Sequence, residues 1–158
     1  MATMGSDQKR LLIAKAVIAA VGLGHLIVGL MFWFAPHLAV EEILAWGPAS
    51  GWTAILGSYD LSVAFGLALA YRDPVHNASM VKFVGFLLVL HAATHMYYVF
   101  WGDAPARMWF VSSYLTAAGV AMFWIAARWL APTASSLATS ATTSTTTSSA
   151  PSSTGSPV

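Results

Sequence analysis

The sequence predicts an all-α integral membrane protein: a four-helix bundle with both termini in the cytoplasm and a disordered C-terminal tail. Three observations predict this fold class. The chain of 158 residues is 58% hydrophobic and only 8% charged, whereas a soluble domain has about 25% charged residues. Four separate stretches are apolar over the roughly 20 residues that a helix needs to cross a bilayer. The few Lys and Arg residues fall mostly on one side of these stretches.

The four predicted spans form one membrane domain, residues 11–130, and cover residues 11–34, 52–71, 81–101 and 108–130. Residues 1–10 are a cytoplasmic N-terminus. The first span is longer than the roughly 7–15 apolar residues of a signal peptide, so we interpret it as a retained helix. Pro74 ends the second helix, within a short polar turn at 72–77. In the longer connection at 35–51, two glutamates among apolar residues of segment 37–46 predict a short amphipathic helix in the membrane interface.

The distribution of basic residues predicts the orientation. Cytoplasmic loops are enriched in Lys and Arg. If the N-terminus is cytoplasmic, six of the seven basic residues lie on that side, namely Lys9, Arg10, Lys15, Arg72, Lys82 and Arg128. Only Arg107 is then external. Tryptophans favour membrane interfaces, and five of them form a predicted outer belt: Trp33, Trp46, Trp52, Trp101 and Trp109.

The C-terminal segment, residues 131–158, consists almost entirely of Ser, Thr, Ala and Pro and has no charge. Such a segment cannot bury enough apolar surface to fold. We therefore predict a disordered cytoplasmic tail.

Several classes of function are excluded or disfavoured by composition. Because the chain has no cysteine, it cannot form disulfides, iron–sulfur clusters or Cys-ligated zinc sites. A net charge of +1 without a basic tract gives no footprint for nucleic acid. We find neither a nucleophile–base arrangement nor a phosphate loop, so no catalytic residue is assigned and an enzyme is not favoured.

The candidate site consists of polar residues within the apolar spans: His25, Tyr59, Asp60, His91, His95 and Tyr114. Ionisable groups inside a bilayer are costly and often mark function. At a helical rise of 1.5 Å per residue, the three histidines, Asp60 and Tyr114 all lie roughly 9–15 Å from the outer ends of their helices. Four helices thus place polar groups at one level, which predicts a polar pocket between the midplane and the outer surface.

The pocket residues allow several interpretations. His91 and His95 share a helix face, and together with His25 and Asp60 they suit a transition metal such as Zn, Fe or Cu. His25 and His91, from two helices, can alternatively ligate a b-type haem. Asp60, His91 and Tyr114 can instead hydrogen-bond a quinone or form a proton path. In a fourth interpretation the polar residues only lock the helices together.

Two sequence patterns concern packing. Ser58, Ser62 and Gly66 form a stripe of small residues at a spacing of four, which predicts a close helix contact on a different face from Asp60. Segments 25–36 and 91–105 share an order of residues: a histidine, then Phe-Trp, then Ala-Pro. Two helical hairpins related by a parallel repeat would produce this order.

Three short motifs resemble a known group of proteins. They are Gly57-Ser58-Tyr59, the turn Tyr71-Arg72-Asp73-Pro74-Val75-His76 followed by Ser79 and Phe83, and Val89-Leu90-His91-Ala92. Over roughly residues 11–130 the chain is similar to small bacterial four-helix membrane proteins of the DoxX-like type. This resemblance implies a multi-pass protein of the bacterial cytoplasmic membrane with a role in redox or membrane stress, sometimes as a partner of quinone-linked enzymes.

From the residues and the resemblance we expect a non-enzymatic protein that binds a small quinone-like ligand or serves as an accessory subunit of a membrane redox complex. The alternatives are a haem- or metal-binding protein, with His25, His91 and His95 as the metal ligands, and a structural or assembly subunit. The expected partners are the lipid bilayer and either subunits of a membrane redox complex or further copies of the same chain.

Overall fold

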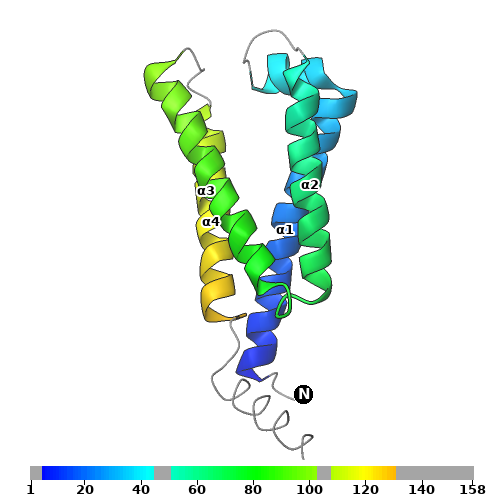
Figure 1. Cartoon of the computed structure of the whole chain (residues 1–158), viewed down its shortest axis with the longest axis vertical. Coiled ribbons are helices and arrows are strands. Elements are labelled where there is room, and N and C mark those ends of the chain that lie inside the picture. The colour runs from blue at the N-terminus through cyan, green and yellow to red at the C-terminus, as the bar shows by residue number, and fades with distance from the viewer. Residues whose placement is uncertain (1–4, 45–50, 103–107, 131–158) are drawn as a thin grey trace, which may run out of the picture.

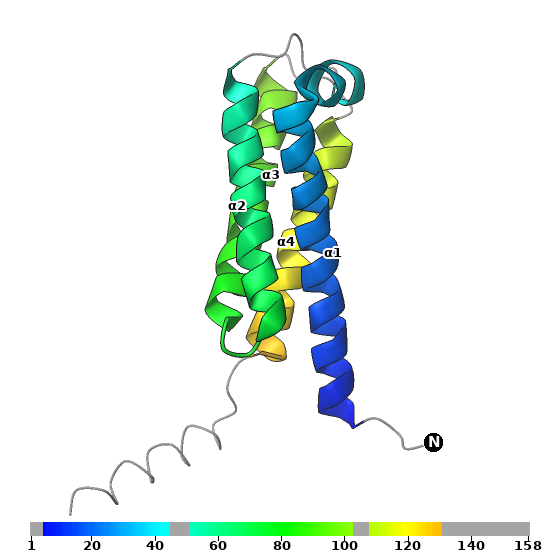
Figure 2. The same ribbon diagram turned by 90° about the vertical axis from the view of Figure 1, so that its right-hand side faces the viewer.

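The computed structural model describes residues 5–44, 51–102 and 108–130. Four long helices are joined in an up-and-down order: α1 (Ser6–Phe34), α2 (Trp52–Arg72), α3 (Ala78–Trp101) and α4 (Met108–Arg128). A short π-helix, η1 (Leu38–Ile43), follows α1. Within the described residues every regular element is helical (Figures 1 and 2), which confirms the predicted fold class. Predictions for Trp46, Arg107 and the tail 131–158 lie outside the described residues.

The predicted spans match the helices closely. The largest difference is at α1, which begins at Ser6, five residues before the predicted span. This extra turn and a half is polar, and Arg10 forms an ion pair with Asp7 at 3.5 Å. Asp7 also lies in the first turn, where a negative charge interacts favourably with the helix dipole. The helix can therefore continue past the apolar run.

The turn between α2 and α3 is held by Asp73. Its carboxylate accepts a hydrogen bond from the backbone N–H of His76 at 3.1 Å, and its carbonyl oxygen accepts one from the Asn77 side chain at 2.9 Å. Pro74 disfavours helical geometry at the residue before it, and α2 ends at Arg72. The predicted tight turn is confirmed.

The connection after α1 contains the predicted short helix, η1. Ala39 and Val40 are buried against Phe32 near the end of α1, and Trp52 and Leu56 of α2 pack on the same cluster. Leu38 and Ile43 are about half exposed. The element therefore caps one end of the α1–α2 pair while it leaves apolar side chains for the membrane interface.

Glycines set how closely the helices approach. A Cβ on Gly57 of α2 would lie 3.0 Å from the carbonyl oxygen of Gly29 in α1. A Cβ on Gly119 of α4 would lie 2.6 Å from the carbonyl oxygen of Gly85 in α3. Small residues permit such backbone contact between membrane helices. Each close contact is thus made within a pair, α1 with α2 or α3 with α4.

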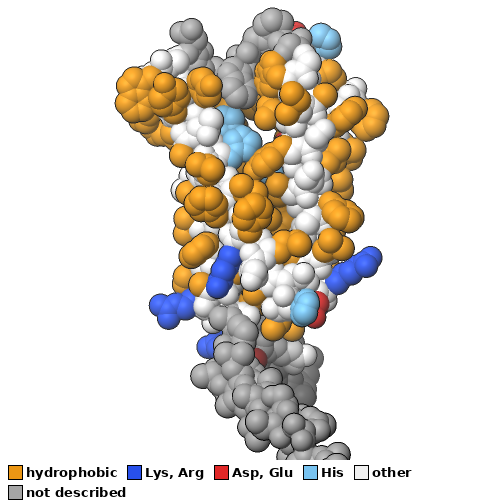
Figure 3. Space-filling view, viewed as in Figure 1, with side chains coloured by type: hydrophobic (Ala, Val, Ile, Leu, Met, Phe, Trp, Pro, Cys, Tyr) orange, Lys and Arg blue, Asp and Glu red, His pale blue; other side chains and the backbone are white. Residues whose placement is uncertain are grey.

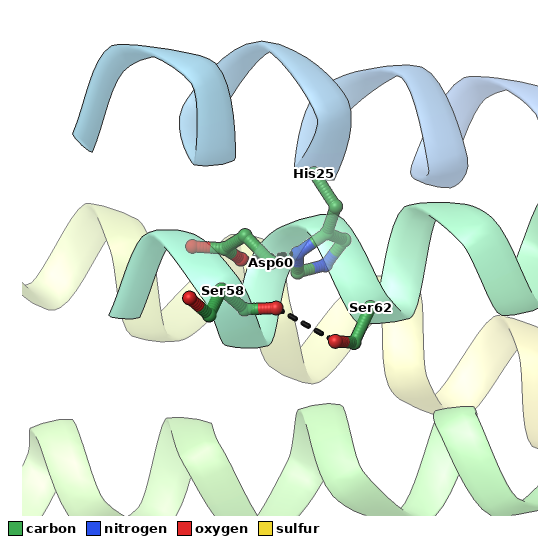
Figure 4. A network of polar contacts seen from close by, with 4 residues as sticks. All are labelled: His25, Ser58, Asp60 and Ser62. Atoms are coloured by element: carbon green, nitrogen blue, oxygen red, sulfur yellow. Dashed lines mark hydrogen bonds and ion pairs between the residues drawn. The ribbon is translucent and has the colours of Figure 1, made fainter. Parts of the chain in front are cut away.

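The predicted contact through Ser58, Ser62 and Gly66 is not the one that forms. Ser58 and Ser62 are exposed, and each hydroxyl donates to a carbonyl oxygen of its own helix. Figure 4 shows the bond from Ser62 to the Ser58 carbonyl oxygen. A Cβ on Gly66 would meet only the Met80 sulfur, at 3.6 Å. The spacing of small residues did not indicate which face of α2 makes the close contact. That face carries Gly57, the residue before Ser58, which lies against α1.

The two pairs share one apolar core. Each long helix contributes a side chain that is at most 1% exposed: Ile18, Leu67, Leu88 and Met122. Contacts are extensive within each pair and sparse between α2 and α3 or between α1 and α4. Figure 1 shows the pairs close together near the α2–α3 turn and diverging toward the end that carries η1. We call the diverging half the outer half, in accordance with the predicted orientation.

All four long helices are long and apolar enough to cross a membrane. Many large apolar side chains point away from the bundle, among them Ile55, Phe65, Phe83 and Phe110, each at least 60% exposed. Among the described residues, every Lys and Arg lies toward the end opposite the outer half, where Figure 3 shows them gathered. The chain is a multi-pass membrane protein.

Candidate functional site

A buried pair of ionisable side chains joins α1 to α2. His25 Nδ1 lies 2.6 Å from Asp60 Oδ1 (Figure 4). The two residues are only 4% and 5% exposed. When the carboxylate is ionised it can only accept, so Nδ1 is then the donor, and the contact fixes the orientation of the imidazole ring. The sequence placed these residues at one depth, and the structure brings them into contact.

The local packing of α1 explains why His25 faces α2. Gly22 and Gly29 lie one turn before and after it, and a Cβ on either would touch Leu67 or Leu61 of α2 within 3.3 Å. The three residues follow a spacing of three and four along α1, so they share one helix face. His25 is therefore enclosed by the closest part of the α1–α2 contact.

Tyr59 connects this pair of helices to α3. Its ring lies edge-on to the His91 ring, with centroids 5.2 Å apart and an interplanar angle of 73°. His91 in turn stacks on His95, with centroids 4.6 Å apart and an angle of 16°. The predicted shared face of the two histidines is confirmed. Because Tyr59 directly precedes Asp60 on α2, these ring contacts join the three helices in one polar cluster.

Tyr114 approaches the cluster from α4. A Cβ placed on Gly24, the residue before His25, would lie 2.9 Å from the Tyr114 hydroxyl oxygen. The ring itself is 46% exposed. The structure thus places all six predicted site residues on facing parts of the four helices, although Tyr114 reaches the backbone of α1 and makes no hydrogen bond with a described residue.

Two buried polar atoms of the cluster have no hydrogen-bond partner among the described residues. They are His25 Nε2 and the Tyr59 hydroxyl oxygen. An unsatisfied polar group inside an apolar environment is unfavourable by roughly 1–3 kcal/mol. Buried polar groups are usually paired, so these two atoms are the exceptions that call for an explanation.

The arrangement of the histidines bears on the predicted metal ligands. Within residues 5–44, 51–102 and 108–130, no three His, Asp or Glu side chains form a group that could hold a metal ion. Nδ1 of His25 is already engaged by Asp60. The three-histidine site of His25, His91 and His95 therefore gains no support from the fold and stays a prediction.

The space beside the cluster is open on one side. Figure 3 shows the surface hollowed between the two helix pairs in the outer half, with histidine side chains at the edge of the hollow. This hollow follows from the divergence of the pairs in Figure 1. The hollow lies between the pairs and leaves the close glycine contacts within each pair intact.

Sequence patterns missed one residue of this site. The Tyr114 hydroxyl lies against Gly24, and the position of this glycine next to an intramembrane histidine was the one sequence signal for its role.

Comparison of the chain with known protein families, with curated proteins and with solved structures finds no match. Fold and site together define a four-helix membrane protein with a buried polar cluster that extends from the α1–α2 pair to α3.

Proposed function

We propose that the protein binds a lipophilic, quinone-like molecule in the outer half, between the α1–α2 and α3–α4 pairs. The observation that carries this proposal is the pair of buried, unpartnered polar atoms, His25 Nε2 and the Tyr59 hydroxyl. A quinone combines a planar apolar ring with carbonyl oxygens. It can therefore occupy a membrane-exposed hollow and still satisfy polar groups there.

The His25–Asp60 pair suits both forms of such a ligand. With Asp60 holding the proton on Nδ1, a neutral His25 presents a lone pair at Nε2 and accepts a hydrogen bond from a quinol hydroxyl. An imidazole that carries a proton on Nε2 donates from this atom to a quinone carbonyl. The Tyr59 hydroxyl can donate or accept. The cluster thus recognises the oxygens of either form.

The rings around these atoms favour a flat ligand. Tyr59 and His91 meet edge to face, and His91 and His95 stack nearly parallel. Aromatic rings of this kind bind planar partners by stacking and edge contacts. The proposed role is non-enzymatic. As the DoxX-like resemblance implies, the protein would act as an accessory subunit of a membrane redox complex in the bacterial cytoplasmic membrane.

A binding experiment tests the proposal. The full chain is purified in mild detergent and titrated with decylubiquinone, with binding followed by quenching of tryptophan fluorescence. Tyr59→Phe removes one unpartnered hydroxyl without changing the shape of the ring. We expect weaker binding by roughly fivefold to tenfold, since a neutral hydrogen bond contributes about 1 kcal/mol. Thermal stability should stay equal or rise, because a buried unsatisfied group is removed.

Tyr98→Phe is the matched control, since Tyr98 is 46% exposed on α3. Its affinity for the quinone should equal that of the wild type. Absence of saturable quenching in the wild type, or equal affinity in Tyr59→Phe, would overturn the proposal. A loss of stability in Tyr59→Phe would instead support the structural interpretation of the cluster.

A second candidate, a b-type haem, is favoured by one feature. Histidines that ligate a metal commonly hold their other ring nitrogen on a carboxylate, and His25 does so with Asp60. An absorption spectrum of protein expressed with haem supplied distinguishes the two functions. A Soret band that disappears in His25→Ala would establish haem binding, and a colourless sample would exclude it.

A further inference from the structure

Each helix pair has an apolar groove on its membrane-facing surface. The groove between α1 and α2 has a volume of about 640 Å³ and is lined mainly by aliphatic and aromatic side chains, among them Leu23, Leu26 and Phe65. The groove between α3 and α4 has a volume of about 480 Å³ and is lined by Phe86, Val89 and Phe123, among others. Both grooves are separate from the His25–Asp60 cluster.

Both grooves run to a basic end on the same side of the molecule. Arg72, the last residue of α2, lines the first groove, and Arg128, the last residue of α4, lines the second. Lys15 adds a second cation to the first groove, because its Nζ lies 5.4 Å from the ring centroid of Tyr71, which lines it. On α3, Lys82 precedes the groove residues Gly85 and Phe86 by one turn.

These cations have no acidic partner in the described part of the chain. Among those residues, none of Lys15, Arg72, Lys82 and Arg128 forms an ion pair with a carboxylate. The nearest acidic residue in sequence is Asp73, whose carboxylate accepts the His76 N–H. Each groove therefore combines a long apolar surface with an arginine at one end and a lysine nearby, and none of these cations is in an ion pair within the described residues.

We propose that each groove binds one anionic phospholipid of the cytoplasmic leaflet. An acyl chain would lie along the apolar groove, and the phosphate would lie between the Lys and the Arg at its end. Basic pockets between membrane helices on the cytoplasmic side bind anionic headgroups, and the predicted orientation places all four cations on that side. The sites correspond to each other: Lys15 with Arg72 on the first hairpin, Lys82 with Arg128 on the second.

The charges favour a lipid over other occupants. A second copy of the chain in the same orientation would bring its own basic end to the same level, and like charges at short range repel. Free phosphate would use the cations but would leave the apolar length of the groove unexplained. A phospholipid with a net negative charge satisfies both parts. This inference is independent of the proposed quinone-like ligand.

The test is native mass spectrometry of the full chain in detergent, titrated with dioleoyl-phosphatidylglycerol or dioleoyl-phosphatidylcholine. We expect two sites that prefer the anionic lipid. Each cation near an anionic headgroup contributes about 1 kcal/mol, so the double variant Lys15→Gln/Arg72→Gln should weaken one site roughly 30-fold. Lys82→Gln/Arg128→Gln should weaken the other equally.

The control for charge is Lys9→Gln/Arg10→Gln, which removes two cations on the same predicted side but outside both grooves. It should leave both sites unchanged. Equal weakening by this control, or no preference for the anionic lipid in the wild type, would overturn the proposal. Circular dichroism of each variant confirms that the helices remain folded.

A second variant tests the groove itself. Ala68 is exposed and lines the first groove, so Ala68→Phe should fill it and lower lipid binding while the cations remain. Ala20→Phe is the matched control, because Ala20 is exposed on α1 outside the groove. Inorganic phosphate at millimolar concentration should not displace the lipid. Unchanged lipid binding in Ala68→Phe, or displacement of the lipid by phosphate alone, would show that only the cations hold the ligand. Either result would overturn the lipid assignment.

Discussion

The two helix pairs are built on the same plan but are held together differently. Both bring a glycine of one helix against the backbone of the other. The α1–α2 pair adds the buried ionisable contact between His25 and Asp60. In the α3–α4 pair, the hydroxyls of Ser112 and Thr116 donate hydrogen bonds to carbonyl oxygens of α4 itself.

Close backbone approach at glycines is thus common to both pairs, whereas the His25–Asp60 contact belongs to the first. The α3–α4 pair has the closer backbone approach, at Gly119 and Gly85, and adds apolar packing. A buried ion pair is weak support for stability, because desolvation offsets much of the Coulombic gain. The His25–Asp60 pair lies in the same cluster as two buried polar atoms without a partner among the described residues, which is why the proposed ligand is placed there.

The largest expected effect comes from breaking the ion pair on one side. Asp60→Leu leaves His25 buried without its partner and should lower the free energy of unfolding by roughly 3–5 kcal/mol. The double variant His25→Leu/Asp60→Leu should recover most of that loss, since no polar group remains unpaired. Unfolding in sodium dodecyl sulfate, followed by circular dichroism, measures both. If the loss of unfolding free energy in the double variant equalled the sum of the losses in His25→Leu and Asp60→Leu, the two residues would not be coupled.

The next effect tests the contact within the α3–α4 pair. Gly119→Ala places a Cβ 2.6 Å from the Gly85 carbonyl oxygen, a backbone atom, so the helices must move apart. We expect a loss of roughly 1–3 kcal/mol in the same unfolding assay. Gly66→Ala is the control. Its Cβ would have ordinary contact with Met80 at 3.6 Å, and alanine's helix propensity should stabilise the protein by up to about 1 kcal/mol. Equal effects of the two substitutions would contradict the glycine contact.

The smallest effect is expected between the pairs. Gly24→Ala places a Cβ 2.9 Å from the Tyr114 hydroxyl, but this is the end of a half-exposed side chain that can turn away. The loss should stay below about 1 kcal/mol. In a Tyr114→Phe background the same substitution should cause no measurable loss in the free energy of unfolding. If Gly24→Ala destabilised as strongly as Gly119→Ala, the two pairs would be joined more tightly than their divergence indicates.

Much of the fold could be predicted because apolar length and charge are local properties of the sequence. The spans agreed with the helices to within a few residues, and Pro74 correctly ended α2. The depth of His25, Asp60 and His91 followed from counting along each helix. The contact face of α2 could not be found in this way. Gly57 and Ser58 are neighbours in sequence, and only packing against α1 decided between them.

The sequence by itself determined that the chain forms four membrane-spanning helices and that polar residues from each of them lie at one level. A bilayer enforces both outcomes, since backbone groups must bond within a helix and ionisable groups are too costly to face lipid. Only the tertiary structure decided which polar groups pair: His25 with Asp60, Tyr59 with His91. Pairing depends on the rotation of each helix about its axis, which is set by glycine contacts with its neighbours rather than by any single segment.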